Sequence, residues 1–183
     1  MTDDVTDAEA LLARLARPGD AAPGTGLRYG YRLGGLALLV DAGLKSEVME
    51  AARLCPVPRT PPALAGLVNV RGNIVPVFDL EQALGLPPPD QVPEHVLVLG
   101  EGEAAAGVRI ARLPESVRLA GAVEAAPPPA LAGHVQGAWH DVHGTLWWAL
   151  DHRACFRQLQ RELSGLAPGG PPPHPAAASA ASA

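Results

Sequence analysis

The sequence predicts an all-β protein with a few short helices, arranged as a barrel or a sandwich. Three observations favour this class. The central part of the chain contains several short apolar segments, each bounded by turn residues. Glycine and proline number 20 each among 183 residues, which is typical of a chain with many tight turns. Because these apolar segments do not alternate with long helical patterns, a doubly wound nucleotide-binding fold is disfavoured.

Composition divides the chain into three segments. Residues 1–26 form a polar arm, residues 27–165 carry nearly all the β-branched and aromatic side chains, and residues 166–183 contain mainly alanine and proline. Apart from Leu166 at its start, this tail has no large apolar side chain and cannot offset the entropy lost on ordering, so we expect residues 166–183 to be disordered.

Charge and targeting signals narrow the class of protein. The chain has 14 Lys and Arg against 19 Asp and Glu, a formal net charge of −5, which argues against nucleic acid or an anionic membrane as the main partner. The sequence lacks an apolar run near 20 residues, and its acidic start is unlike a signal peptide. Cys55 and Cys155 lie too far apart for a paired-thiolate motif. We therefore expect a cytoplasmic protein.

The arm is predicted to contain one short helix. Thr6 and Glu9 have the spacing of a capping box, and Pro18 ends the helical pattern. An apolar stripe lies between these signals, formed by Leu11, Leu12 and Leu15. A helix this short is marginal alone, so it either docks on the body or frays.

The body is predicted to consist mainly of strands. The apolar segments that carry this prediction are 27–35, 36–40, 73–80, 95–100, 107–110 and 144–151. Pro76 lacks a backbone N–H, which places its strand at an edge or a bulge. Residues 44–54 fit a helix and an edge strand about equally well.

Two helices are expected in the body. A short one covers Glu81 to Leu84 with Asp79 as its N-cap, and a longer one follows Asp151 and ends at Gly165. The apolar face of the longer helix is formed by Phe156, Leu159 and Leu163.

Chemistry-bearing motifs are weak in this sequence. It shows neither a nucleophile–base pair nor a phosphate-binding loop in a strand–loop–helix context, so we expect neither an enzyme nor a bound cofactor. One cluster could hold zinc and comprises His134, His140, Asp141, His143, His152 and Cys155. The sequence around His140 and His143 is typical of a strand–turn–strand, which would point them to opposite faces. We favour surface histidines and keep a ligand- or metal-binding β-domain as the alternative function.

The segment from Pro61 to Leu80 is the most informative part of the chain. Arg71 and Gly72 occupy a turn between two apolar stretches. An arginine at such a turn pairs with a carboxylate, contacts a partner's surface, or caps local carbonyls.

The stretch NVRGNIVPVFDL resembles the signature of CheW-like domains, the adaptor proteins of bacterial chemosensory arrays. The matching residues are Gly66, Asn69, Arg71, Gly72, Pro76, Asp79 and Leu80. The resemblance extends over most of residues 27–160 and includes YRLGG at 31–35 and SEVM at 46–49. The long arm and these variants are most similar to the PilI-type members, which serve type IV pilus twitching motility.

This resemblance implies a fold and a function. The fold would be two small five-stranded SH3-like β-barrels sharing a core, with helices near both termini. The protein would be a non-catalytic, cytoplasmic adaptor at membrane-associated receptor arrays. Its partners would be the cytoplasmic tip of a methyl-accepting receptor and the regulatory domain of a CheA-type histidine kinase.

The resemblance also suggests roles for individual residues. The residues expected to contact partners are Glu47, Val48, Asn69 and Arg71. Those expected to shape turns and bulges are Gly66, Gly72, Pro76 and Asp79. Alternatively, Glu47 and Arg71 only fix the groove between the barrels. The sequence departs from the family pattern at Lys45, and at Ala111 and Pro114, where an aspartate is missing and a proline enters.

Overall fold

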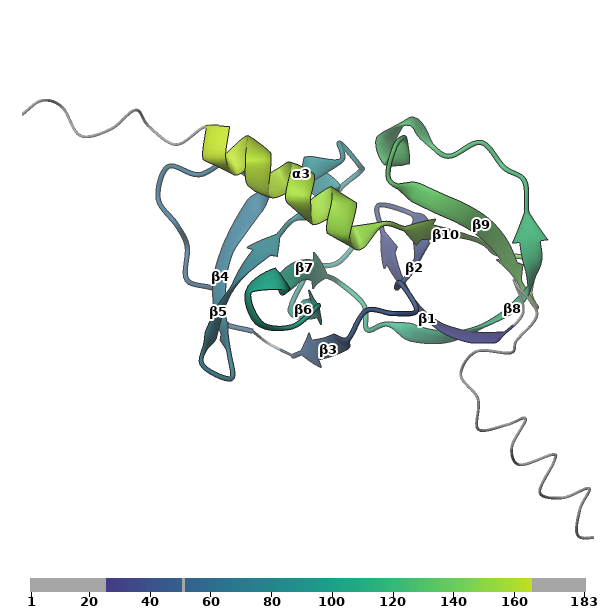
Figure 1. The fold of residues 1–183 in the computed structure, drawn as a ribbon, viewed down its shortest axis with the longest axis horizontal. Coiled ribbons are helices and arrows are strands. Elements are labelled where there is room, and N and C mark those ends of the chain that lie inside the picture. Colours follow the sequence, from purple (N-terminus) through teal and green to yellow (C-terminus); the bar gives the residue numbers. More distant parts are fainter. Residues whose placement is uncertain (1–25, 51, 166–183) are drawn as a thin grey trace, which may run out of the picture.

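A computed structural model describes residues 26–50 and 52–165, which form two five-stranded sheets packed on each other (Figure 1). The first sheet is a closed barrel of β1 (Gly26–Leu33), β2 (Leu36–Leu39), β10 (Leu146–Leu150), β9 (Val135–Asp141) and β8 (Glu115–Val123). The second sheet has the order β3 (Ser46–Met49), β6 (His95–Leu99), β7 (Ala106–Ile110), β5 (Asn73–Phe78) and β4 (Leu64–Val70). The predicted mainly-β class is therefore confirmed, although among the described residues no backbone ladder joins β3 to β4.

The barrel is assembled from both ends of the described chain. β1 and β2 form a hairpin, and β10 pairs with β2 in parallel while β8 pairs with β1 antiparallel. The whole second sheet lies between β2 and β8 in the sequence.

One apolar core is shared by the two sheets. Its members come from both sheets and from the last helix, and they include Tyr31, Leu38, Phe78, Leu97, Val108, Trp148 and Phe156. Each sheet also has a smaller core on its other face, around Val77 in the second sheet and around Trp147 in the barrel. The adjacent Trp147 and Trp148 are both buried, because strand alternation sends one into the barrel and the other into the shared core.

Trp147 fills the barrel interior and leaves room only for a glycine opposite it. A Cβ atom on Gly30 of β1 would lie 2.2 Å from Cζ3 of the Trp147 ring. The other end of the ring is held by its indole N–H, which donates to Oδ2 of Asp141 at 2.9 Å. Oδ1 of Asp141 accepts from the backbone N–H groups of His143 and Thr145 in the β9–β10 turn. Although burial opposes it, these hydrogen bonds lower the pKa of Asp141 to about 2.

Strand β5 is internal, so of the two alternatives for Pro76 the edge position is wrong, whereas a bulge does occur in the adjoining part of the β4–β5 pairing, between Leu64 and Gly66. Pro76 lies opposite Leu67 on β4. Both backbone polar groups of Leu67 bond to Cys55 on the other side, at 2.8 and 2.9 Å, so the Leu67–Pro76 pair shares no hydrogen bond. The proline nitrogen therefore faces β7, whose pairing with β5 begins only at Val77. A proline is tolerated here because the ladder on that side has not yet started.

The predicted helices of the body are confirmed. α2 (Leu80–Ala83) begins after Asp79, whose side chain accepts from the Gln82 N–H, and α3 (His152–Gly165) begins after Asp151, whose Oδ1 accepts from the Ala154 N–H at 2.8 Å. Figure 1 shows α3 leaving β10 and crossing the second sheet, where Phe156 stacks near Phe78. Two 3₁₀ turns, η1 (Gly102–Ala104) and η2 (Pro129–Leu131), complete the described elements.

Two further outcomes concern the strands and the chain ends. Within residues 44–54, the edge-strand alternative is the correct one, since Ser46–Met49 forms β3. Strands β4 and β8 are not among the predicted strand segments. The predicted arm helix and the tail 166–183 lie outside the described residues.

Candidate interaction site

The turn between β4 and β5 presents Arg71 at the surface. Val70 and Asn73 pair across a two-residue turn, in which Arg71 and Gly72 have φ angles of 52° and 89°. Positive φ at both central positions matches the twist of a β-hairpin and suits Gly72 well. The side-chain oxygen of Asn69 accepts from the Gly72 N–H at 2.8 Å and fixes the turn. Arg71 is thereby held in a left-handed conformation that few residues other than glycine adopt.

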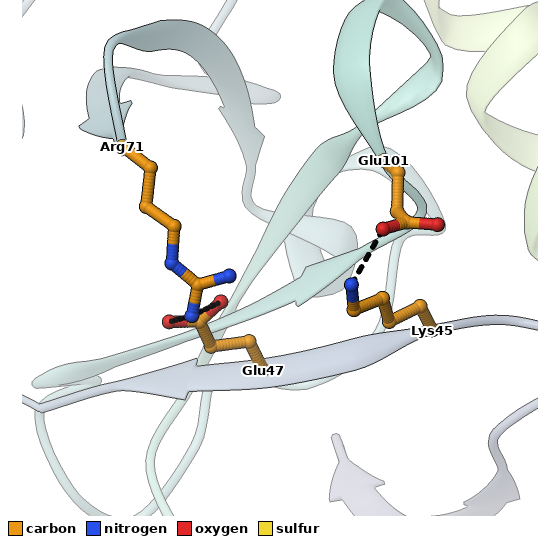
Figure 2. A network of polar contacts seen from close by, with 4 residues as sticks. All are labelled: Lys45, Glu47, Arg71 and Glu101. Carbon is orange, nitrogen blue, oxygen red and sulfur yellow. Dashed lines mark hydrogen bonds and ion pairs between the residues drawn. The ribbon is translucent and has the colours of Figure 1, made fainter.

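Arg71 forms an ion pair with Glu47 on the edge strand β3. Nη2 of Arg71 lies 2.9 Å from Oε1 and 2.8 Å from Oε2 of Glu47 (Figure 2). The side chains remain 71% and 38% exposed. An exposed pair of this kind contributes at most about 1 kcal/mol to stability. The pair links the β4–β5 turn to β3, on the side of the sheet where the described residues show no backbone ladder between β3 and β4.

A shallow hollow of about 110 Å³ lies beside this pair. A second ion pair, between Lys45 and Glu101, lines it, and Figure 2 shows the two pairs side by side over β3 and β6. Val75 and Val98 provide its apolar wall. The hollow therefore combines two cations, two anions and an apolar surface, a composition suited to a protein partner.

The other predicted site residues take distinct positions. Val48 is half-buried against the shared core, so only part of its side chain faces outward. Gly66 lies at a bulge in β4 with φ of 147°, and a Cβ there would approach the Cys55 carbonyl oxygen to 2.7 Å. Asp79 caps α2, and its Oδ2 lies 3.8 Å from Nη1 of Arg109.

The histidines of the alternative hypothesis are spread over the barrel, the loop before β9 and the start of α3. His140 and His143 are exposed, His134 is half-buried in the loop after η2, and His152 is buried with its Nε2 2.8 Å from the Tyr31 hydroxyl. Burial lowers the pKa of His152 to about 4. In the described part of the chain, no three His, Cys, Asp or Glu side chains come close enough to hold a metal ion.

The departures from the family pattern lie apart from the Arg71 turn, with one exception. Lys45 belongs to the hollow, whereas Ala111 lies at a separate surface depression beside Arg32 and Arg112. Pro114 immediately precedes β8. Of the helices in residues 26–50 and 52–165, none combines the length and the apolar character needed to cross a bilayer.

Two small β-sheets that share one core, with two exposed ion pairs lining a surface hollow, define a class of two-sheet β-domain whose surface is suited to a protein partner. Comparison with known proteins identifies the family within this class. The family described as CheW-like domain matches residues 30–160, and the chain belongs to this family of scaffold proteins in chemotaxis-type signalling.

Individual relatives agree with that assignment. The chain is 34% identical over 112 residues to Protein FrzA of Myxococcus xanthus, covering 58% of this chain and 69% of FrzA. It is 27% identical over 71 residues to a probable chemotaxis protein CheW of Rhizobium etli, covering 39% of this chain and 46% of that protein. Among solved structures, the scaffolding protein TtCheW of Thermoanaerobacter tengcongensis shares the fold, with a TM-score of 0.54 and 19% identity over 69% of this chain and 88% of TtCheW.

Proposed function

We propose that this protein couples a methyl-accepting receptor to a CheA-type histidine kinase in the cytoplasm, at a membrane-associated receptor array. The contact surface is the hollow bordered by Arg71 and Glu47, with Asn69 next to it in the turn. Val48, the remaining residue expected to contact a partner, packs toward the shared core on the other face of the sheet and adds only its exposed part to this surface. The observation that carries this proposal is that Arg71, held at φ of 52° in an exposed turn, lies at the hollow and pairs there with Glu47. The family membership supplies the class of partner.

The energetics of Arg71 support a role other than stability. A left-handed conformation costs a residue with a Cβ about 1 to 2 kcal/mol, and the exposed ion pair returns at most about 1 kcal/mol. Glycine would therefore suit this position at least as well for folding. A strained residue of this kind is often retained at a functional site.

The chemistry of Arg71 supports recognition of a carboxylate. Within the described residues, its polar contacts use Nη2 alone, so the remaining guanidinium N–H groups face solvent. A partner carboxylate could accept from these groups, or could replace Glu47 as the acceptor. Glu47 would then be free to accept from a cation of the partner.

The pathway is proposed from the sequence resemblance to PilI-type adaptors, which favours type IV pilus twitching over flagellar chemotaxis. Deletion of the gene tests this choice. We expect loss of twitching with swimming retained, and loss of swimming with normal twitching would contradict the pilus assignment.

Calorimetric titration with the regulatory domain of the kinase from the same organism tests the contact surface. We expect micromolar or tighter binding by the wild type. Arg71→Gly should weaken binding at least about tenfold, equivalent to 1.4 kcal/mol, with an unchanged or raised melting midpoint.

Arg59→Gly is the matched control. Arg59 is also exposed and also has positive φ, at 61°, but it lies away from the hollow. The control should gain the same stability and keep full kinase affinity. Wild-type affinity in the Arg71→Gly variant would refute the proposed contact.

A further inference from the structure

An exposed apolar patch lies where β1 enters the barrel. Leu27, Tyr29 and Val142 expose 66%, 59% and 53% of their surfaces. Leu27 lies directly opposite Arg118 on β8, and the Arg118 carbonyl accepts from the Val142 N–H at 3.0 Å. Leu27 and Val142 therefore flank Arg118, and Tyr29 lies two residues further along β1, opposite Ser116. We call the surface formed by these three apolar residues the β1 patch.

The β1 patch continues an apolar stripe that is covered elsewhere. Leu27, Tyr29, Tyr31 and Leu33 alternate along β1 and share one face of the strand. The second half of the stripe is buried in the shared core, where Tyr31 and Leu33 are each 1% exposed. The first half extends beyond the second sheet and is left without a cover among the described residues. Exposed apolar residues gathered in this way mark a surface for a further contact.

We propose that residues 6–17 of this same chain cover the β1 patch as an amphipathic helix. The sequence pattern in this arm predicts a helix with one apolar stripe of leucines at positions 11, 12 and 15. The charges of this segment are separated along its length, with Asp7 and Glu9 before the leucines and Arg14 and Arg17 toward the other end, so its acidic end is the one that complements Arg118. The arm joins the body at Gly26, immediately before Leu27.

The connecting segment has a suitable length. Residues 18–25 are rich in glycine and alanine and contain two prolines. A random-coil chain of eight residues has a root-mean-square span of about 16 Å, and a 12-residue helix is about 18 Å long. The helix therefore reaches the patch by folding back on the connector. Such a tether holds the arm at an effective concentration of about 1 mM or more, so a weak contact suffices for docking.

Hydrogen–deuterium exchange of the full chain, read by mass spectrometry on the peptide covering residues 6–17, tests this proposal. We expect wild-type exchange at least about tenfold slower than the intrinsic rate at every protein concentration. Leu11→Asp with Leu15→Asp should restore the intrinsic rate, whereas Ala10→Asp with Ala13→Asp should not. The second pair adds the same charge on the opposite face of the predicted helix.

Substitutions on the body provide the reciprocal test. Leu27→Ser with Tyr29→Ser should also restore the intrinsic rate of the arm, without any change in the arm's own sequence. The matched control is Ile74→Ser with Val92→Ser, two residues that are 63% and 75% exposed elsewhere on the surface. All four positions are exposed, so folding should persist, and near-ultraviolet circular dichroism verifies it.

Two results would overturn the proposal. Wild-type arm exchange at the intrinsic rate would show that the arm leaves the patch uncovered. Protection that appears only as the protein concentration rises, together with a dimer in sedimentation, would assign the patch to a second copy of the chain instead.

Discussion

Replacing Gly30 by alanine should destabilise the protein through a single steric contact. The Cβ atom would lie 2.2, 2.8 and 2.9 Å from three atoms of the Trp147 ring. An ordinary contact begins at 3.4 Å, so the strand or the ring would have to move by about 1.2 Å. The ring has little freedom to move, because it is 1% exposed and Asp141 holds its indole N–H.

The magnitude follows from two opposing contributions. Overpacking of a well-filled core costs about 1 to 3 kcal/mol, and the rigid environment of this ring places the clash at the upper end. Gly30 does not have a positive φ, so alanine gains about 0.4 to 1 kcal/mol from the restricted unfolded chain. We expect a net loss of about 2 kcal/mol, which lowers the melting midpoint of a chain of this size by about 4 to 8 °C.

Chemical and thermal unfolding of a small set of variants measures this effect. Gly121→Ala is the matched control, because Gly121 lies in β8 of the same barrel with no atom within 4 Å of its added Cβ. In a Trp147→Leu background, Gly30→Ala should cost much less, giving a coupling of about 2 kcal/mol in the double-mutant cycle. Equal midpoints for the two alanine variants, or strict additivity in the cycle, would refute the steric argument.

Three further predictions concern buried groups. Because the pKa of Asp141 is lowered from 3.8 to about 2, its carboxylate contributes its full stabilisation above pH 3.8. In urea unfolding, the wild type should therefore have a higher free energy of unfolding than Asp141→Asn near neutral pH, and this difference should disappear as the pH falls toward 2. The pKa of His152 is lowered from 6.5 to about 4, so between these pH values only the unfolded chain binds a proton at His152, and the free energy of unfolding should fall as the pH drops from 6.5 to 4. His152→Gln should remove this pH dependence, whereas Tyr31→Phe, which loses only the hydroxyl partner of His152, should retain most of it. Gly66→Ala should cost about 2 kcal/mol or more in thermal unfolding, because φ of 147° is unfavourable for alanine and its Cβ would meet the Cys55 carbonyl oxygen; a smaller loss than in Gly121→Ala would contradict this.

Local signals in the sequence were sufficient for much of the fold. The caps at Asp79 and Asp151 predicted the starts of both helices, because a cap depends on residues within one turn. Strand β8 is missing from the predicted strands, although Val117 and Leu119 are separated and flanked by the polar residues Ser116 and Arg118. The surrounding stretch contains Pro114 and few large apolar residues, which weakens its strand pattern.

The candidate site required information that local patterns do not contain. Arg71 and Glu47 were both selected from the sequence, but their mutual pairing was not foreseen. They lie 24 residues apart, and their contact depends on a sheet order in which β3 and β4 occupy opposite edges of one curled sheet. The incorrect prediction of an edge position for β5 has the same cause, a dependence on the order of the strands in the sheet. Pro76 shows that its strand lacks one backbone N–H donor. Whether an internal strand tolerates this loss depends on where the neighbouring strand β7 begins to pair, which the local sequence does not indicate.

The assembly of the barrel from both ends of the described chain has a consequence for synthesis on the ribosome. Leu38 and Trp148, which pair across β2 and β10, are 110 residues apart. Contacts of such high sequence separation form late and slow the folding of a domain. Until β8 to β10 emerge from the ribosome, both outer edges of the β1–β2 hairpin lack a partner strand. The hairpin's apolar side chains, which belong to the shared core in the folded protein, are exposed to other chains during this time. Nascent chains that stall before residue 115 should therefore be the aggregation-prone species of this protein and the ones on which chaperones act.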